Sequence, residues 1–549
     1  MDTHIITGKL VDCFKKEIYP AEITVREGRI ASVRRLGGQD AGSVLPFILP
    51  GFIDAHIHIE SSMLVPAEFA RLAVVHGTVA TVSDPHEIAN VCGLEGVDFM
   101  VGNGRSVPFK FYFGAPSCVP ATGFETAGAK LDSFDVEKLL DRPEIKYLSE
   151  MMNFPGALHG DPEVMKKIQA ARQRGKPVDG HAPGLRGDDA RNYISRGITT
   201  DHECFTREEA LDKLGSGMKI IIREGSAARN FDALADLLHD HPEQMMFCSD
   251  DKHPDSLVEG HINRLCARAV ARGIDVFSVV RAACVNPVLH YNLEVGLLRE
   301  GDPADLILVR DLERFDVLET MIDGVTVAES GVSRIRADRS LSGQPINRFS
   351  CRQMAEVDFA MPVSELEKYP FPVIEALDGQ LITGKIDLQP MKKEGHWVSD
   401  TVRDILKIVV VNRYEEAPVA KAFISNFGLK SGALASSVAH DSHNIVAVGV
   451  DDESLVRAVN LVISERGGVS CVRDGEDLVL PLPVAGLMSL EDGYEVADIY
   501  TKIDKAAKEA GSNLSAPFMT LSFMALLVIP HLKLSDLGLF DGDRFEVMS

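Results

Sequence analysis

The stretch PGFIDAHIHIE, residues 50–60, is the part of the sequence that decides the fold. Residues 47–53 are mostly apolar and bounded by Pro and Gly, which predicts a short buried strand that runs directly into His56 and His58. Side chains two positions apart on a strand point to the same side, so the two imidazoles can meet at one point and bind a transition metal. A histidine pair also occurs in ordinary packing or on surfaces, so the metal hypothesis depends on the rest of the chain.

The length and the net charge of the chain are those of an ordinary globular protein. A chain of 549 residues is too long for one ordinary domain, and we expect two or three. The formal net charge is −24, without long blocks of like charge. An acidic chain of this kind is a poor partner for nucleic acid or an anionic membrane surface, and we expect neither.

The cysteine pattern and the apolar runs indicate where the protein works. The nine cysteines are scattered and form no C-x-x-C pair, which argues against a disulfide framework or a thiolate zinc site and suits a reducing cytoplasm. The first residues lack a basic segment followed by an apolar one, and the apolar run 518–530 is too short and interrupted to span a bilayer. We therefore predict a cytoplasmic protein without a targeting or transmembrane segment.

Three regions follow one another along the chain. Residues 1–49 contain short β-rich runs, and residues 50–289 contain eight candidate strands, each followed by helical or loop sequence. Eight such units predict an α/β fold of the (β/α)8 or TIM-barrel type. Residues 290–345 return to β character and are expected to join residues 1–49 in a composite β-sandwich. After a polar linker at 340–352, residues 353–549 predict a further α/β domain.

Polar residues stand where the predicted strands end. In a TIM barrel the carboxyl ends of all strands meet at one mouth, so side chains that are far apart in sequence converge there. The residues in question are His56 and His58 (strand 1), Asp84, His86 and Glu87 (strand 2), Glu150 (strand 4), His181 (strand 5), His202 and Glu203 (strand 6), and Asp250 and Asp251 (strand 8). Their convergence is the strong signal for a metal-dependent active site.

Several motifs together carry a family resemblance. PGFIDAHIHIE, GHAPG, TTDHE, CSDDKHP and GLLREGDPADLILV resemble the amidohydrolase superfamily of metal-dependent hydrolases. SDPHEIANVCG, the long run from Asn412 to Val450, and PLPVAGLMS look more narrowly like the bacterial adenine deaminase family, including its extra C-terminal domain. The resemblance covers essentially the whole chain, and the C-terminal motifs are far more specific than the histidine pair.

The resemblance implies a ligand set for two divalent metal ions. His56, His58 and Asp250 would hold the more buried ion, and His181 and His202 would hold the second. Many relatives bridge the ions with a carboxylated lysine, but Lys146 lies at the start of strand 4, whereas Glu150 stands near its end as the family's alternative. The family's metals would be manganese or iron, and the mixed N/O ligand set is also compatible with zinc.

The implied reaction is the hydrolytic deamination of adenine to hypoxanthine and ammonia. A metal-activated hydroxide would attack C6, and Asp250 would carry a proton from the hydroxide to the leaving amino group. Attack also needs a protonated ring nitrogen, for which Glu203 is the first candidate and Glu87 the second. The resemblance implies a small-molecule purine substrate and a homo-oligomer.

Some assignments stay open from the sequence. Asp250 and Asp251 could exchange roles, His253 could contact substrate or orient its loop, and Glu203 could fix a histidine tautomer. Asp84, His86 and Glu87 could stabilise a loop, contact substrate or bind an accessory metal. The polar stretch 440–444 could reach over the barrel mouth, or form a turn or interface.

Two other functions compete with the deaminase. A cyclic-amide hydrolase of the dihydroorotase or hydantoinase kind would share the histidines, but a strand-4 lysine would favour it and Glu150 counts against it. A barrel that lost catalysis and serves as an assembly protein should also have lost ligands, whereas every expected ligand position here is filled. The fold alone does not decide, because TIM barrels host many chemistries.

Overall fold

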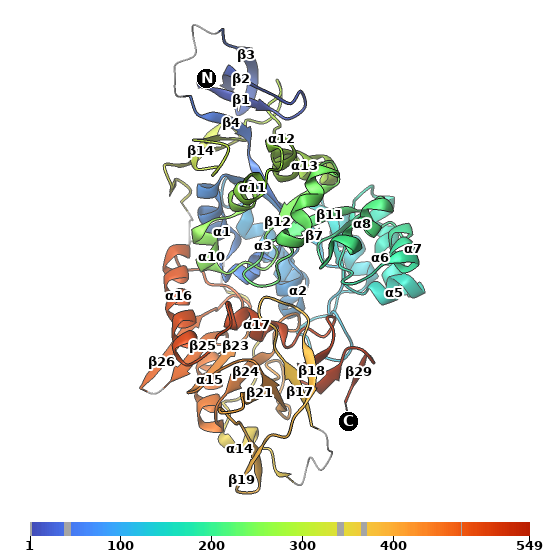
Figure 1. The fold of residues 1–549 in the computed structure, drawn as a ribbon, viewed down its shortest axis with the longest axis vertical. Coiled ribbons are helices and arrows are strands. Elements are labelled where there is room, and N and C mark those ends of the chain that lie inside the picture. Colours follow the sequence, from blue (N-terminus) through green and yellow to red (C-terminus); the bar gives the residue numbers. More distant parts are fainter. Residues whose placement is uncertain (1–2, 38–44, 337–344, 364–370, 474, 549) are drawn as a thin grey trace.

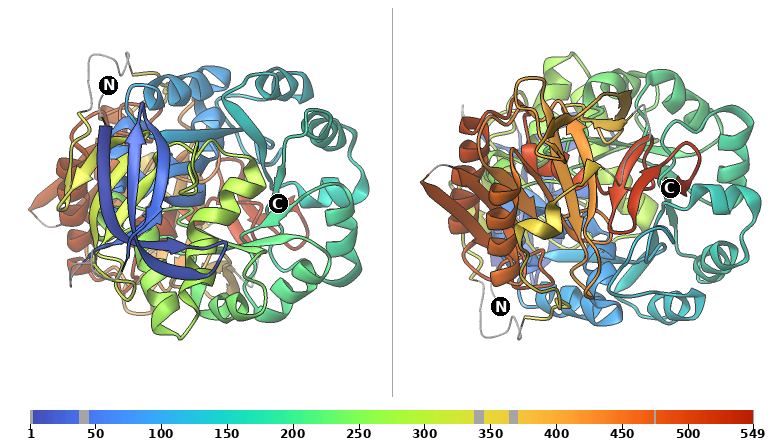
Figure 2. Two further views of the ribbon diagram at one scale, coloured as in Figure 1. Left: turned by 90° about the horizontal axis from the view of Figure 1, so that it is seen from above. Right: turned by 90° about the horizontal axis from the view of Figure 1, so that it is seen from below.

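The computed structural model describes residues 3–37, 45–336, 345–363, 371–473 and 475–548. Figure 1 shows three regions along its vertical axis, with the N-terminal strands at the top, a barrel in the middle and the C-terminal region at the bottom. Seen from above and below in Figure 2, the N-terminal strands and the C-terminal region cover opposite ends of the barrel. Within the described ranges, every helix is too short or too polar to cross a membrane.

An eight-stranded sheet lies at the N-terminal end, in the order β16-β15-β14-β13-β4-β1-β2-β3. Its two halves meet where β4 pairs antiparallel with β13, which places Leu49 opposite Ile307. Segments separated in sequence by the whole barrel therefore share one hydrogen-bonded sheet. The strands are β1 (Thr3–Asp12), β2 (Glu17–Arg26), β3 (Arg29–Arg35), β4 (Phe47–Pro50), β13 (Leu306–Val309), β14 (Val317–Ile322), β15 (Val325–Glu329) and β16 (Val332–Ser333).

Eight parallel strands form the barrel, which confirms the predicted (β/α)8 architecture. Their side chains are almost entirely buried, as expected for continuous apolar strands covered on both faces. They form two ladders, β5-β6-β7-β8-β9 and β10-β11-β12. The strands are β5 (Phe52–Ile57), β6 (Thr78–Ser83), β7 (Lys110–Ala115), β8 (Ile145–Met151), β9 (Val178–Gly180), β10 (Thr200–Asp201), β11 (Lys219–Arg223) and β12 (Met245–Cys248).

Backbone hydrogen bonds join the two ladders at both seams. At one seam the Asp250 N–H donates to the His56 carbonyl at 3.0 Å, and the His58 N–H donates to the Asp250 carbonyl at 3.4 Å. At the other seam the Thr199 N–H donates to the Val178 carbonyl at 2.9 Å. The closed ring brings the end of strand eight beside the end of strand one.

Helices surround the strands and begin at typical capping residues. Asp132, Asp161 and Thr206 accept backbone N–H groups at the starts of α4, α6 and α8. The helices of this region are α1 (Pro66–Ala73), α2 (His86–Cys92), α3 (Leu94–Gly104), α4 (Ser133–Leu140), α5 (Phe154–His159), α6 (Pro162–Gln173), α7 (Gly187–Ser195), α8 (Arg207–Gly215), α9 (Phe231–Leu234), α10 (Pro254–Glu259), α11 (Ile262–Ala271), α12 (Val276–Val280) and α13 (Asn286–Tyr291).

The C-terminal region is built on a second eight-stranded sheet, in the order β18-β17-β22-β21-β24-β23-β25-β26. Helix α15 (Asp452–Ser464) packs on β23, β24 and β25, and α16 (Gly493–Glu509) packs on α1 and α10 of the barrel. Two smaller sheets, β19-β20 and β27-β28-β29, complete the region. The remaining helices are α14 (Glu356–Phe359) and α17 (Pro517–Phe523). The strands are β17 (Pro372–Glu375), β18 (Gly384–Asp387), β19 (Met391–Lys393), β20 (His396–Val398), β21 (Ile405–Val411), β22 (Ala420–Ser425), β23 (Ala433–Ser436), β24 (Ile445–Gly449), β25 (Gly468–Arg473), β26 (Glu476–Pro481), β27 (Leu532–Ser535), β28 (Gly538–Asp541) and β29 (Glu546–Val547).

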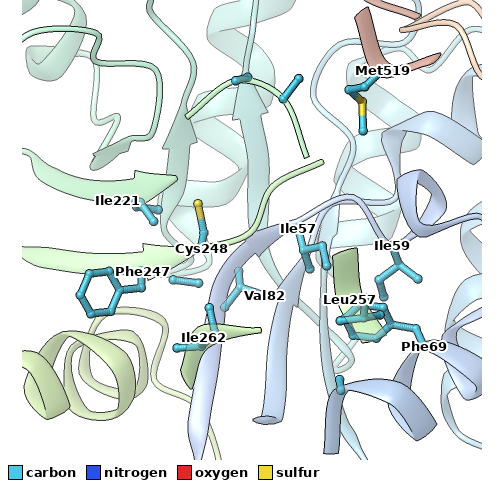
Figure 3. Close-up of a cluster of buried hydrophobic side chains, with 14 of the residues drawn as sticks. Ile57, Ile59, Phe69, Val82, Ile221, Phe247, Cys248, Leu257, Ile262 and Met519 are labelled. Atoms are coloured by element: carbon cyan, nitrogen blue, oxygen red, sulfur yellow. The ribbon is translucent and has the colours of Figure 1, made fainter. Parts of the chain in front are cut away.

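One apolar core runs from the barrel into the C-terminal region. Figure 3 shows Ile57, Val82, Ile221 and Phe247 of the barrel strands in one buried cluster with Met519 of α17. Burial of this shared surface stabilises the two regions as one body, at roughly 25 cal/mol per Å² of apolar area. The C-terminal region is therefore fixed against the barrel.

Arg413 anchors the chain where it enters the C-terminal region. Of the predicted linker at 340–352, residues 340–344 lie outside the described residues, and the rest packs beside Arg413. The fully buried guanidinium donates to four neutral oxygens: the Ala485 carbonyl at 2.6 Å, Asn347 Oδ1 at 2.9 Å, the Arg348 carbonyl at 3.2 Å and the His443 carbonyl at 3.3 Å.

Replacing Arg413 by lysine should therefore destabilise the protein. Lysine presents its donors from one nitrogen, so most of these buried oxygens would lose a partner, and we expect Arg413→Lys to lower the free energy of unfolding by about 2–4 kcal/mol. Urea unfolding of the whole chain measures the change. The control is Arg403→Lys, at a half-exposed pair with Asp400, where we expect less than about 0.5 kcal/mol. Equal effects at the two positions would contradict the prediction.

Candidate active site

Two imidazoles converge at the end of β5. His56 Nε2 lies 3.1 Å from His58 Nε2, and both side chains are buried. The shared direction follows from the pleat of a strand, in which residues two apart face the same side. Two ligand nitrogens around one ion at about 2.0–2.1 Å are separated by roughly 3–3.4 Å. The pair therefore fits two ligands of a single metal ion.

Asp250 faces this pair, whereas its neighbour Asp251 does not. Asp250 Oδ1 lies 3.3 Å from His58 Nε2 and 3.8 Å from His56 Nε2. The residue adopts φ = 54°, a left-handed conformation that aspartate tolerates better than most residues. Asp251 instead accepts a hydrogen bond from Ser61 Oγ at 2.6 Å. Of the two assignments left open by the sequence, the geometry favours Asp250 as the ligand.

Glu150 lies between two groups of imidazoles. Its Oε1 is 3.3 Å from His58 Nε2, while its Oε2 is 2.7 Å from His181 Nδ1 and 3.1 Å from His202 Nε2. All four side chains are buried. One carboxylate that contacts both groups has the geometry of a bridging ligand.

The donor set fits a pair of divalent ions. Four imidazoles and two carboxylates offer the mixed nitrogen and oxygen ligands that manganese, iron and zinc accept. The groups His56–His58–Asp250 and His56–Glu150–His202 each offer ligand atoms within 4.8 Å of one another, and all of these side chains are buried. Such short distances among neutral nitrogens and carboxylate oxygens suit atoms arranged around an ion.

Arg223, at the end of β11, binds two carboxylates of the site. Its Nη1 contacts Glu203 Oε1 and donates to Asp250 Oδ2 at 2.6 Å, and its Nη2 donates to Glu203 Oε2 at 3.0 Å. Burial would raise the pKa of Glu203, but the charges of Arg223 and His181 lower it to about 2. Glu203 is thus held as a carboxylate, and it also lies 3.3 Å from His202 Nε2.

The start of α2 brings His86 and Glu87 to the same mouth. His86 Nδ1 lies 3.0 Å from Asp84 Oδ2 and 3.6 Å from Glu150 Oε1. Glu87 contacts two histidines of the C-terminal region, with Oε1 on His440 Nδ1 and Oε2 on His443 Nε2. The polar stretch 440–444 therefore reaches the barrel mouth.

His440 is placed between two carboxyl groups. Its Nδ1 contacts Glu87, and its Nε2 lies 3.6 Å from Asp251 Oδ1. Burial would lower the pKa of His440, but Glu87 and Asp251 raise it to about 9. The imidazole therefore carries a proton at neutral pH.

A cavity opens at the mouth between the two regions. Its apolar wall is formed by Met152, Leu381 and Leu526. Its polar wall is formed by histidines, carboxyl groups and one arginine: His58, His86, His181, His202, His440, Glu87, Glu150, Glu203, Asp250, Asp251, Asp441 and Arg223. Leu381 and Leu526 belong to the C-terminal region. His253 does not line the cavity; its Nδ1 is 2.6 Å from the Tyr500 hydroxyl of α16.

Comparison with known proteins identifies the family. A model of the amidohydrolase family matches residues 47–327, and a model of the adenine deaminase C-terminal domain matches residues 380–546. A protein named adenine deaminase from Salinibacter ruber is 56% identical over 545 residues, which cover 98% of each chain. The chain belongs to the adenine deaminase family. Proteins of the same name from Methanosarcina barkeri and Borreliella burgdorferi are 51% and 46% identical, over 98% and 99% of this chain and of their own.

Solved structures align with about three fifths of the chain. A β-aspartyl dipeptidase from Fervidobacterium islandicum aligns with 61% of this chain and 99% of its own, at 15% identity and a TM-score of 0.46. An N-acetylglucosamine-6-phosphate deacetylase from Mycobacterium smegmatis aligns with 59% of this chain and 99% of its own, at 18% identity and a TM-score of 0.44. Membership of the amidohydrolases implies a divalent metal cofactor, which agrees with the donor set at the mouth.

Sequence reasoning missed four residues that line the cavity: Arg223, Met152, Leu381 and Leu526. Arg223 ends β11 as the histidines end their strands, so its position was a usable signal, although an arginine at a strand end is usually a surface residue. Leu381 and Leu526 do not follow barrel strands, so their position gives no such signal. From the sequence, apolar residues of the C-terminal region are indistinguishable from ordinary core residues. Their contribution depends on how that region docks on the barrel.

Removing the charge of Arg223 should destabilise the metal-free protein. Arg223→Met leaves the buried carboxyl groups of Glu203 and Asp250 without their cation, so we expect the free energy of unfolding after chelation to fall by about 3–5 kcal/mol. The control is Arg229→Met on the following loop, where the side chain donates only to the Gly225 and Ser226 carbonyls and the loss should be about 1–2 kcal/mol. Urea titration measures both, and an equal loss would exclude a special role of the Arg223 charge.

Proposed function

We propose that this protein catalyses the hydrolytic deamination of adenine to hypoxanthine and ammonia. The observation that carries the proposal is the 46–56% identity to proteins named adenine deaminase over nearly the whole chain. The buried imidazoles and carboxyl groups at the barrel mouth supply the site that such chemistry needs.

His56, His58 and Asp250 would hold one ion, His181 and His202 the other, and Glu150 would bridge them. Ions held there would lower the pKa of a bound water, which is the chemistry that would supply hydroxide at neutral pH for attack on C6 of the purine. We propose manganese or iron as the pair, since both accept this mixture of imidazole and carboxylate, and zinc is also compatible with it.

Asp250 is placed to move a proton during the reaction. Its Oδ1 faces His58, and its Oδ2 is bound by Arg223. We propose that the carboxylate accepts the proton of the attacking oxygen and passes it to the exocyclic amino nitrogen, which then leaves as ammonia. Arg223 would keep the carboxylate oriented and ionised between these two steps.

The ring nitrogen next to C6 must be protonated as the oxygen attacks. Glu203 and Glu87 remain the two candidates for this acid, and both line the cavity. Met152, Leu381 and Leu526 offer an apolar surface for the purine ring. Of the other predicted substrate contacts, Asp251 and His86 line the cavity, whereas Asp84 and His253 would act through His86 and Tyr500.

The arrangement disfavours a cyclic-amide hydrolase that depends on a carboxylated lysine. Lys146 lies at the start of β8, with its Nζ over the ring of Tyr112 at 6.0 Å, whereas Glu150 occupies the position between the imidazoles. Among the described residues no lysine lines the cavity, and we propose that the carboxylate of Glu150 takes the bridging role.

We further propose a cytoplasmic homo-oligomer. All nine cysteines are free thiols, and most are buried, which suits a reducing compartment. The proposal of an oligomer rests on the family resemblance, and light scattering of the purified protein measures the oligomeric state directly.

A spectrophotometric adenine assay on protein prepared with manganese tests the function. We expect turnover by the parent, and a loss of more than about 100-fold with reduced bound metal in Glu150→Gln, because even partners outside the ligand shell cost 10–100-fold. Glu163→Gln, on the exposed start of α6, should match the parent. If the parent binds two ions and leaves adenine unchanged, the substrate assignment fails and dihydroorotate and hydantoin become the next compounds to assay.

A further inference from the structure

The contacts of Glu203 make it a poor proton donor. Arg223 binds both of its carboxylate oxygens. A guanidinium does not release its proton at neutral pH, so Glu203 has no group behind it that could supply one. Its distance of 3.5 Å from His181 Nδ1 and 3.3 Å from His202 Nε2 suits a residue that orients these two imidazoles.

Glu87 differs because imidazoles contact both of its oxygens. Burial would raise the pKa of Glu87, but the charges of His440, His86 and His443 hold it well below its usual range. Glu87 therefore rests as a carboxylate and can give a proton to a substrate only as an imidazole beside it supplies one. We propose that the C-terminal region completes the active site, with His440 delivering through Glu87 the proton that reaches the ring nitrogen of adenine and His443 holding Glu87 in position. This inference rests on the proposed deamination.

The two histidines have different hydrogen-bond states. The Ala439 N–H donates to His443 Nδ1 at 3.1 Å, so this nitrogen is an acceptor and the hydrogen of the neutral ring is on Nε2, where it faces Glu87 Oε2. His443 is thereby fixed as a donor to Glu87. His440 Nε2 is buried and has no hydrogen-bond partner among the described residues, and its ring lines the cavity between Glu87 and Asp251. His440 is therefore free to hold and release a proton.

The turn that carries both histidines is held firmly in place. The Tyr414 hydroxyl contacts the Ser442 carbonyl, and Arg413 Nη1 donates to the His443 carbonyl at 3.3 Å. Asn444 Nδ2 donates across the interface to the Thr126 carbonyl at 2.9 Å. These contacts fix the turn on both the C-terminal sheet and the barrel. Proton transfer requires this, because the donor must stay within hydrogen-bond distance of Glu87.

The protons balance over one turnover. Formation of hydroxide from water releases one proton, and Asp250 carries the other to the amino group as ammonia leaves. The proton that Glu87 gives to the ring nitrogen stays on hypoxanthine, so Glu87 must be supplied once in every cycle. His440 supplies it and regains a proton from water, which makes the sum adenine plus water to hypoxanthine plus ammonia.

Glutamine substitutions distinguish the delivery of a proton by His440 from the positioning of Glu87 by His443. A glutamine amide can donate a hydrogen bond but cannot release a proton. We expect His440→Gln to lower kcat by about 100–10,000-fold, the usual contribution of a proton-transfer group. We expect His443→Gln to stay within about 10-fold of the parent and His443→Leu to fall well below it, because only glutamine keeps a donor toward Glu87. Bound metal should match the parent in all three, and the control is His396→Gln at the exposed first residue of β20.

The outcomes decide between the inference and its alternatives. Parent-like kcat in His440→Gln, or equal kcat in His443→Gln and His443→Leu, would overturn it while leaving the deaminase itself intact. If His440→Gln does not fold, as judged by bound metal and the unfolding midpoint, the His443 pair decides. A parent that binds metal but leaves adenine unchanged would instead reject the proposed function on which the inference rests.

Discussion

The active site depends on how the barrel closes between its first and last strands. The Asp250 N–H donates to the His56 carbonyl at 3.0 Å, which pairs the residues after β12 with the end of β5. This backbone contact, together with the left-handed conformation of Asp250, turns its carboxylate toward the two histidines. Without closure, the residues of strands one and eight would be separate polar groups on two sheet edges. With closure, they share one point in space.

Burying so many ionisable groups requires that their charges offset one another. Carboxyl groups of Glu87, Glu150, Glu203, Asp250 and Asp251 lie at the mouth with less than a tenth of their surface exposed. An unpaired buried charge is costly, so each needs a cation, a hydrogen-bond donor or a metal. Arg223 donates to the carboxyl groups of Glu203 and Asp250. His440 lies beside those of Glu87 and Asp251, and Glu150 lies among the histidines. The site is an alternation of opposite charges across the boundary of two regions.

The parts of the site that follow from strand geometry could be predicted. His56 and His58 share a direction because of the pleat, and the other histidines and carboxyl groups lie at strand ends, which a parallel barrel collects at one edge. The choice between Asp250 and Asp251 could not be made, because it depends on a φ of 54° that no local pattern signals. The contact of Glu87 with His440 and His443 joins residues more than 350 positions apart and depends on the docking of two regions. Periodicity and motif spacing carry no information at that range.

The position of His440 and His443 also has a consequence for how the enzyme is made. Because the proposed metal ligands all lie in the first half of the chain, a ribosome adds them well before it adds these two histidines. A prematurely terminated chain would then contain the proposed metal ligands and still lack the two histidines that we propose to act on Glu87. Catalytic competence would appear only when the last third of the polypeptide has been translated and docked, so that turnover reports an intact chain rather than a folded barrel.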